Sequence, residues 1–177
     1  MKKKLIYLSG FMGSGKTTVG KILGKKLNLD FIDLDVLIEE KEGRAITDIF
    51  KELGEKYFRK IEKENLRAVS DSGKKIVSLG GGALMDEENQ IFVKDKGILV
   101  YLKVTPEEIY ERLENTIDRP LLLKEDKILC SKNEFKVRIS SLFKAREPGY
   151  LTAGYVIDTV GRTPEKIADE IISYISR

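Results

Sequence analysis

A glycine-rich segment near the N-terminus has the residue types and spacing of a phosphate-binding loop. Residues 10–17 read GFMGSGKT, which fits the pattern G-x-x-x-x-G-K-[ST]; an apolar run precedes them and a stretch of helical periodicity follows. In this setting backbone N–H groups and a helix N-terminus bind phosphate oxygens, Lys16 reaches the β- and γ-phosphates, and Thr17 offers a hydroxyl to Mg2+. A glycine-rich turn with an exposed lysine is the simpler alternative, but strand, motif and helix together favour nucleotide binding.

Two aspartates end a second apolar run, residues 31–35 (FIDLD). The alternation of a strand predicts that Asp33 and Asp35 share one face at the C-terminal edge of a sheet, where open α/β sheets bind ligands. One carboxylate can hold Mg2+ through water, and the other can accept a hydrogen bond from an attacking hydroxyl. Two polar residues that end a strand or cap the next helix remain the alternative.

Further residues suggest a site for a second, phosphate-accepting substrate. Arg59 and Glu62 are three apart in a helical stretch, so the carboxylate can hold the guanidinium. Residues 80–82 are three glycines after an apolar run, where a backbone N–H can approach a substrate closely. Arg119 and Arg146 have the fork that suits a carboxylate or a transferring phosphoryl group. Each alone also fits a surface ion pair, a tight turn or a surface arginine.

Composition limits the remaining chemistry. The chain has 177 residues, a formal charge of +3, one cysteine and no histidine. Histidine-based general bases, nucleophile systems and metal sites are therefore excluded. The weak, mixed-sign charge disfavours nucleic-acid partners, no apolar run approaches the roughly 20 residues that span a bilayer, and the lone Cys130 predicts a free thiol. We expect a cytoplasmic protein with no membrane partner.

Along the sequence, short runs rich in β-branched residues alternate with amphipathic helical stretches, and these segments must position the residues named above. This pattern predicts an α/β fold in which helices cover both faces of a five-stranded parallel sheet. The expected strands are residues 5–8, 31–34, 75–79, 98–102 and 155–157. We expect one domain over residues 1–177, with residues 115–132 as an excursion from the core that could act as a mobile lid.

Taken together, the motifs resemble those of shikimate kinases, P-loop enzymes of the nucleoside-monophosphate-kinase-like type. The resemblance runs nearly end to end and depends on the order and spacing of its parts. These are residues 10–17, 33–35 (DLD), 43–62 with FRKIE at 58–62, 78–82 (SLGGG), 119–122 (RPLL), 146–150 (REPGY), and 158–164. The sequence departs from the family pattern at two positions. Gly149 stands where the family usually has leucine, and Asp118 directly precedes Arg119.

The resemblance implies a three-layer α/β/α P-loop kinase with a small substrate-binding helical segment, about residues 35–62, and a lid, about residues 112–128. It implies transfer of the γ-phosphoryl group of ATP to the 3-hydroxyl of shikimate, giving shikimate 3-phosphate and ADP in aromatic amino-acid synthesis. A kinase of another hydroxy acid such as gluconate, of adenylylsulfate or of a nucleoside monophosphate is one alternative. A noncatalytic nucleotide-binding module of the same fold is the other. We expect a monomer that needs Mg2+.

The resemblance also implies a role for each matching residue. Lys16, Asp35 and Arg119 would be catalytic, and Thr17 and Asp33 would position Mg2+. Shikimate would be bound by Asp35, Arg59, Gly81 and Arg146, with Phe50, Phe58 and Pro120 against its ring. ATP would be bound by Gly13, Ser14, Gly15, Lys16, Thr17, Thr18, Arg112, Arg119 and Arg162, with Arg112 and the loop near Arg162 flanking adenine.

Overall fold

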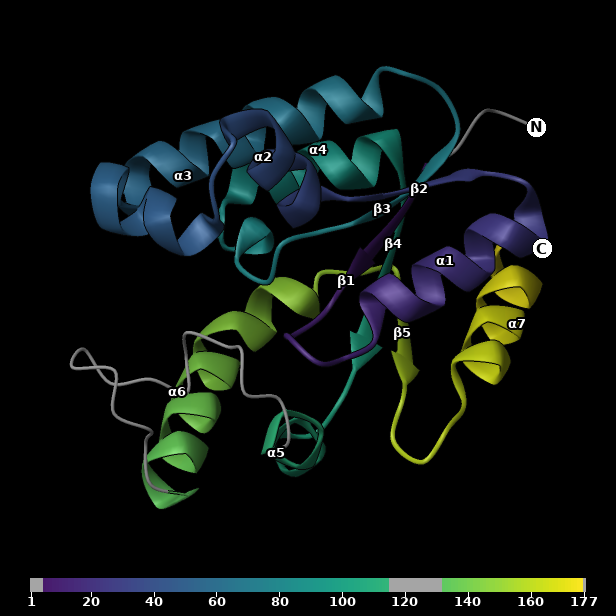
Figure 1. Cartoon of the computed structure of the whole chain (residues 1–177). Coiled ribbons are helices and arrows are strands. Elements are labelled where there is room, and N and C mark those ends of the chain that lie inside the picture. Colours follow the sequence, from purple (N-terminus) through teal and green to yellow (C-terminus); the bar gives the residue numbers. More distant parts are fainter. Residues whose placement is uncertain (1–4, 115–131, 177) are drawn as a thin grey trace.

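A five-stranded parallel sheet forms the centre of the computed structural model, which describes residues 5–114 and 132–176 (Figure 1). Its strands lie in the order β2-β3-β1-β4-β5, and all four neighbouring pairs are parallel. The strands are β1 Leu5–Ser9, β2 Asp30–Asp33, β3 Lys75–Ser78, β4 Gly97–Lys103 and β5 Tyr155–Asp158. All five predicted strands are confirmed, with ends that differ by at most one residue.

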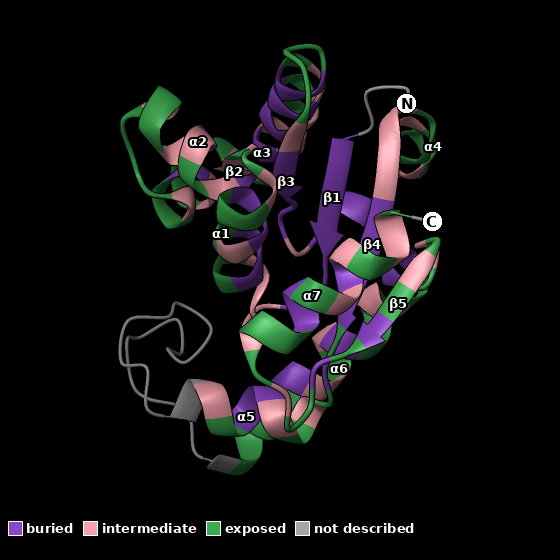
Figure 2. Ribbon diagram, turned by 90° about the vertical axis from the view of Figure 1, so that its right-hand side faces the viewer, coloured by how far each residue is buried: buried purple, intermediate pink, exposed green. Residues whose placement is uncertain are grey.

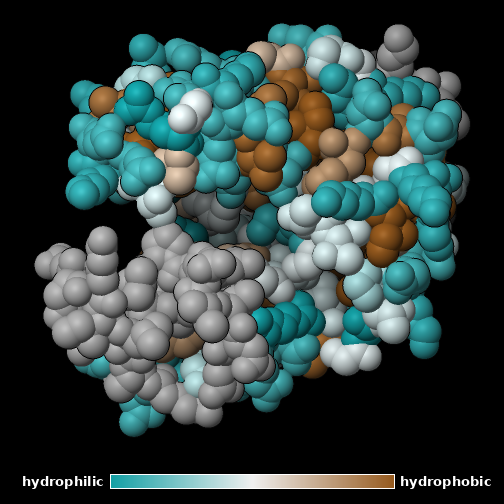
Figure 3. Space-filling model, viewed as in Figure 1, coloured by the Kyte–Doolittle hydropathy of each residue, from teal (hydrophilic) through white to brown (hydrophobic). Residues whose placement is uncertain are grey.

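Helices connect the parallel strands, as crossovers of this kind require. They are α1 Lys16–Leu27, α2 Leu34–Glu42, α3 Ile46–Ser70, α4 Glu87–Lys96, α5 Pro106–Glu114 and α6 Lys132–Tyr150, with a short 3-10 turn at Ala83–Met85. Helix α7, Pro164–Ile175, follows the last strand. None of the described helices is long and apolar enough to cross a bilayer. The outward surface over α2 and α3 is mostly hydrophilic (Figure 3).

The alternation of side chains along β1 divides the core into two layers. Leu5 and Tyr7 belong to the apolar cluster shared with α2 to α6, whereas Ile6 and Leu8 belong to the cluster shared with α1 and α7. Every residue of β1 is buried (Figure 2). Burial on both faces explains why this strand is a continuous apolar run. The three-layer α/β/α prediction is confirmed.

The predicted placement of Asp33 and Asp35 on one strand face is wrong. Strand β2 ends at Asp33, and α2 begins at Leu34, so Asp35 lies in the first helical turn. Leu34 and Ile38, four residues apart, are both fully buried against the core. Their helical spacing decides the local structure, because burial of a helix face outweighs a short alternating pattern.

Gly149, which stands where the family pattern usually has leucine, lies where there is no room for a side chain. A Cβ on Gly149 would lie 2.5 Å from the carbonyl oxygen of Leu84 and 2.2 Å from Cε of Met85. Helix α6 nevertheless continues through this position to Tyr150. The absence of leucine at position 149 therefore lets α6 pack directly on the backbone that follows the three glycines.

We expect Gly149→Ala to lower the free energy of unfolding by about 1–3 kcal/mol, because the added methyl group overpacks this contact. In an unobstructed helix the same change is stabilising by up to about 1 kcal/mol. Urea denaturation followed by circular dichroism measures the difference. A more stable variant would show that helix propensity, and not the contact with Leu84, dominates at this position.

Several predictions fall on residues 115–131, outside the described part of the chain. They concern most of the lid, with Asp118, Arg119, Pro120 and Cys130. The roles expected for these residues stay predictions.

Candidate active site

A cavity of about 490 Å³ lies at the C-terminal ends of β1, β2 and β3. It joins the phosphate-binding loop to α3 and to the end of α6. The predicted site residues that line it are Gly13, Gly15, Lys16, Thr17, Thr18, Asp33, Asp35, Arg59, Gly81 and Arg146. Ser14, Arg112 and Arg162 do not line it. The structure thus brings the predicted phosphate, metal and acceptor residues into one space.

The phosphate-binding loop has the expected conformation. Gly13 and Gly15 have φ angles of 76° and 92°, which residues with a side chain rarely adopt. The Lys16 ammonium donates to the carbonyl oxygens of Gly10, at 2.8 Å, and Phe11, at 3.1 Å. The ammonium is therefore held within the loop at the N-terminus of α1, where a helix of this kind binds phosphates.

Arg112 is held against the same loop from α5. Its Nη1 donates to the carbonyl oxygen of Gly13 at 2.9 Å, and its Nη2 pairs with Glu108 at the same distance. Arg162 lies beside the edge strand β5. Its side chain donates hydrogen bonds to the Glu170 carboxylate and, at 3.2 Å, to the carbonyl oxygen of Asp158. Contact of either arginine with adenine stays a prediction.

Thr17 and Asp33 form the predicted metal pair. The Thr17 hydroxyl donates to Oδ2 of Asp33 at 2.7 Å, across the ends of α1 and β2. Among the described residues no group of three or more acidic, cysteine or histidine side chains surrounds a metal position. One hydroxyl and one nearby carboxylate still fit Mg2+ in a kinase, because this ion keeps waters and binds substrate phosphates in place of a protein cage.

Asp35 is positioned in the same cavity by the first turn of α2. Burial raises the pKa of its carboxyl group, and the nearby Asp33 and Glu39 raise it further, against the opposing effects of Lys16 and Arg59. A carboxylate with a raised pKa is a better proton acceptor than an exposed one. This environment suits a group that interacts with an attacking hydroxyl.

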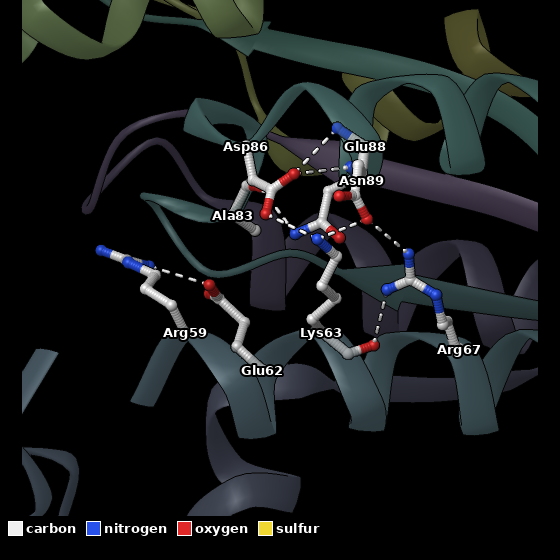
Figure 4. Close-up of polar contacts among 8 residues, drawn as sticks. All are labelled: Arg59, Glu62, Lys63, Arg67, Ala83, Asp86, Glu88 and Asn89. Carbon is white, nitrogen blue, oxygen red and sulfur yellow. Dashed lines mark hydrogen bonds and ion pairs between the residues drawn. The ribbon is translucent and has the colours of Figure 1, made fainter. Parts of the chain in front are cut away.

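Arg59 is fixed by two carboxylates of α3. Its Nη1 lies 2.8 Å from Oε2 of Glu62, which is only 1% exposed (Figure 4). Its Nη2 lies 3.1 Å from Oε1 of Glu55. Burial alone would lower the pKa of Arg59, but the two carboxylates raise it, so the guanidinium stays charged. Glu62 is confirmed as the predicted partner. Glu55 was missed, although its spacing of four from Arg59 is the signal for it.

The glycine after β3 allows two carboxylates to converge. A Cβ on Gly80 would lie 2.6 Å from Oε1 of Glu62 and 2.7 Å from Oδ1 of Asp35. That Glu62 oxygen is buried and has no hydrogen-bond partner among the described residues. Burial raises the pKa of Glu62, and Asp35 raises it further, while Arg59 opposes the shift. Gly80 is therefore needed for close approach rather than for a positive φ.

Ion pairs connect α3 to the segment that follows the glycines. Lys63 lies 3.0 Å from Asp86 and 2.6 Å from Glu88, and Arg67 lies 3.5 Å from Glu88 (Figure 4). The Asp86 carboxylate also accepts from the backbone N–H groups of Glu88 and Asn89, which caps α4. The Asp86 carboxylate thus fixes the start of α4 and also holds α4 against α3, the helix that carries Arg59.

An apolar wall faces the charged residues. The rings of Phe50 and Phe58 have centroids 4.7 Å apart, and both line the cavity. They lie on either side of Gly54, whose φ of 81° and ψ of 166° interrupt α3. The guanidinium carbon of Arg59 lies 5.3 Å from the Phe58 ring centroid, within cation–π distance. This arrangement can hold a small ring that carries an acidic group.

Comparisons with known proteins agree with this geometry. Residues 12–176 match the family model described as shikimate kinase. The shikimate kinase of Chlorobium limicola is 42% identical over 97% of this chain and 88% of its own length. A crystal structure of the Bacteroides thetaiotaomicron shikimate kinase has a TM-score of 0.90 at 31% identity, over 98% of this chain and 99% of its own. The Acinetobacter baumannii enzyme in complex with shikimate has a TM-score of 0.87 at 35% identity, over 99% and 94%. The chain belongs to the shikimate kinase family.

Proposed function

We propose that this protein transfers the γ-phosphoryl group of ATP to the 3-hydroxyl of shikimate, giving shikimate 3-phosphate and ADP. The observation that carries the proposal is one cavity that joins Lys16 of the phosphate-binding loop to a half-buried carboxylate, Asp35, and to two arginines, Arg59 and Arg146. A phosphate site, a hydroxyl acceptor and a cationic fork are the three parts that a kinase of a hydroxy acid needs.

In this proposal the acceptor is held by its carboxylate and by its ring. Arg59 and Arg146 bind the carboxylate, for which a planar guanidinium provides two parallel donors. Phe50 and Phe58 pack against the ring, and the backbone of Gly81 approaches a hydroxyl. Because Arg59 is already fixed by Glu62 and Glu55, little side-chain freedom is lost when the acceptor binds.

Phosphoryl transfer then requires positioning and charge neutralisation more than a strong base. The 3-hydroxyl oxygen bonds to the γ-phosphorus as the bond to the ADP oxygen breaks, and the hydroxyl proton passes to Asp35. Lys16 shifts from its two carbonyl partners to the phosphates and neutralises their charge. We propose that Arg119 stabilises the transferring group, and that Arg112 and Arg162 contact the adenine side of ATP.

Mg2+ is proposed as the accompanying ion, held through Thr17 and Asp33. When bound, it neutralises phosphate charge and orients the γ-phosphoryl group. The side chains themselves arrange this corner of the cavity, since Thr17 donates to Asp33 across it. We further propose a monomer that works in the cytoplasm, where the single cysteine would stay a free thiol.

ADP release tests the proposed function directly. Purified protein with ATP and Mg2+ is supplied in separate reactions with shikimate, gluconate or adenosine monophosphate. Strong stimulation by shikimate alone is expected. Stimulation by another acceptor would overturn the roles of Arg59 and Arg146, and nucleotide binding without acceptor-dependent turnover would indicate a noncatalytic module.

We expect Arg59→Ala to raise the KM for shikimate on the order of tenfold while the KM for ATP changes less than twofold. The lost interaction is a charge-assisted hydrogen bond to the acceptor carboxylate. Steady-state kinetics with each substrate varied in turn measure the split. An unchanged KM for shikimate would place the acceptor carboxylate elsewhere.

A further inference from the structure

The hydroxyl of Tyr150 lies between two parts of the proposed acceptor site. Tyr150 is the last residue of α6 and is 1% exposed. Its Oη donates to the carbonyl oxygen of Gly81 at 2.5 Å, across 69 residues of sequence. The Arg146 guanidinium, one helical turn earlier, lies near enough to this hydroxyl to lower its pKa. A Cβ on Gly81 would lie 3.1 Å from Nη1 of Arg146 and 3.7 Å from this hydroxyl.

We propose that Tyr150 is a positioning residue for the acceptor: its hydroxyl donates to the Gly81 carbonyl oxygen and so fixes the glycine backbone to the end of α6, the helix that carries Arg146. This inference rests on the proposed function, because Arg146 and Gly81 are its acceptor-binding residues. It goes beyond that function in assigning a role to a buried side chain that does not line the cavity.

The hydrogen-bonding capacity of the hydroxyl fits this role. The Gly81 carbonyl oxygen only accepts, so the Tyr150 hydroxyl must be protonated to bond to it. Burial raises the pKa of Tyr150 to about 12, against the opposing effect of Arg146. The hydroxyl therefore keeps the proton that it donates to Gly81 throughout the physiological pH range.

The neighbouring Tyr101 provides a matched control. Its ring centroid lies 5.2 Å from that of Tyr150, and its hydroxyl is buried without a hydrogen-bond partner among the described residues. Tyr101→Phe and Tyr150→Phe therefore each remove one buried hydroxyl from the same aromatic pair. Only Tyr150→Phe removes a hydrogen bond to the Gly81 backbone.

Steady-state kinetics and thermal unfolding of the two variants test the proposal. For Tyr150→Phe we expect the KM for shikimate to rise about fivefold, the size of one lost hydrogen bond, with the KM for ATP changed less than twofold. Tyr101→Phe should leave both KM values unchanged. Equal rises in both KM values for Tyr150→Phe, or a rise for Tyr101→Phe of the same size, would indicate a structural role and overturn the proposal.

A double-mutant cycle supplies a second test. If Tyr150 acts through the Gly81 backbone, Tyr150→Phe should still raise the KM for shikimate about fivefold in an Arg146→Ala background. Loss of the fivefold effect in that background would show that the hydroxyl acts through Arg146 and would overturn the assignment to Gly81. A wild-type enzyme that shikimate does not stimulate would instead refute the proposed function, and this inference with it.

Discussion

Asp35→Asn is expected to lower kcat by about a hundredfold to ten-thousandfold at pH 7, the range for loss of a positioned general base. Asparagine keeps the size of the side chain and its hydrogen bond to the acceptor, but it cannot take the hydroxyl proton. The KM for shikimate should therefore change much less than kcat. ADP release at saturating substrates measures the loss, and nucleotide affinity in the same variant shows whether the phosphate site is intact.

The same substitution should make the protein more stable near neutral pH. Burial raises the pKa of Asp35 in the folded state, so the folded protein binds this proton more tightly than the unfolded chain does. Stability from this group is thus greatest below its unfolded pKa and is lost as the pH rises through the folded pKa. Asparagine removes that loss, so the melting temperature of Asp35→Asn should exceed that of wild type at pH 8, and the difference should shrink in acid.

The pH dependence of wild-type kcat gives a further check on Asp35. Only the ionised carboxylate accepts a proton, so kcat should fall on acidification below the raised pKa, at a higher pH than an ordinary aspartate would allow. The Asp35→Asn variant should lack this acidic limb. If the variant retained wild-type kcat, the carboxylate would only orient the hydroxyl or take no part in the step.

The features that sequence predicted well are local ones. The phosphate-binding loop is a contiguous motif whose glycines and Lys16 are fixed by the backbone that they form, and Arg59 with Glu62 follows from helical spacing alone. The central strands β1, β3 and β4 were predicted because burial on both faces of the sheet gives continuous apolar runs. Local periodicity also misled, since the alternation around Asp33 and Asp35 gave way to the helical packing of Leu34.

The features that sequence could not predict depend on contacts between distant segments. No spacing rule relates Gly80 to Asp35 and Glu62, which three different elements bring together at the edge of the sheet. The same holds for the hydroxyl of Tyr150 on Gly81, since only the packing of α6 against the glycine loop creates that hydrogen bond. These contacts require the tertiary structure, because the chemistry of each residue alone also fits an ordinary core or surface position.

Gly80→Ala is expected to lower kcat/KM for shikimate on the order of a hundredfold, the cost of a displacement of about 1 Å in an active site. Its Cβ would lie within 2.7 Å of both the Asp35 and the Glu62 carboxylate oxygens, so at least one of them must move. Movement of Asp35 misplaces the hydroxyl acceptor, and movement of Glu62 releases Arg59. Both changes affect the acceptor rather than the nucleotide, so the affinity for ATP should stay within twofold of wild type.

Gly154→Ala is the matched control, because a Cβ at this position would have no atom within 4 Å. It adds the same methyl group to a glycine outside the cavity and should leave all kinetic constants unchanged. Full shikimate turnover in Gly80→Ala would mean that the two carboxylates separate without loss of function, which would contradict their convergence as a requirement of the site. Reduced ATP affinity in the same variant would point instead to a disturbance of the phosphate-binding loop. The expected combination, loss on the acceptor side alone, follows only if Gly80 serves to bring Asp35 and Glu62 together.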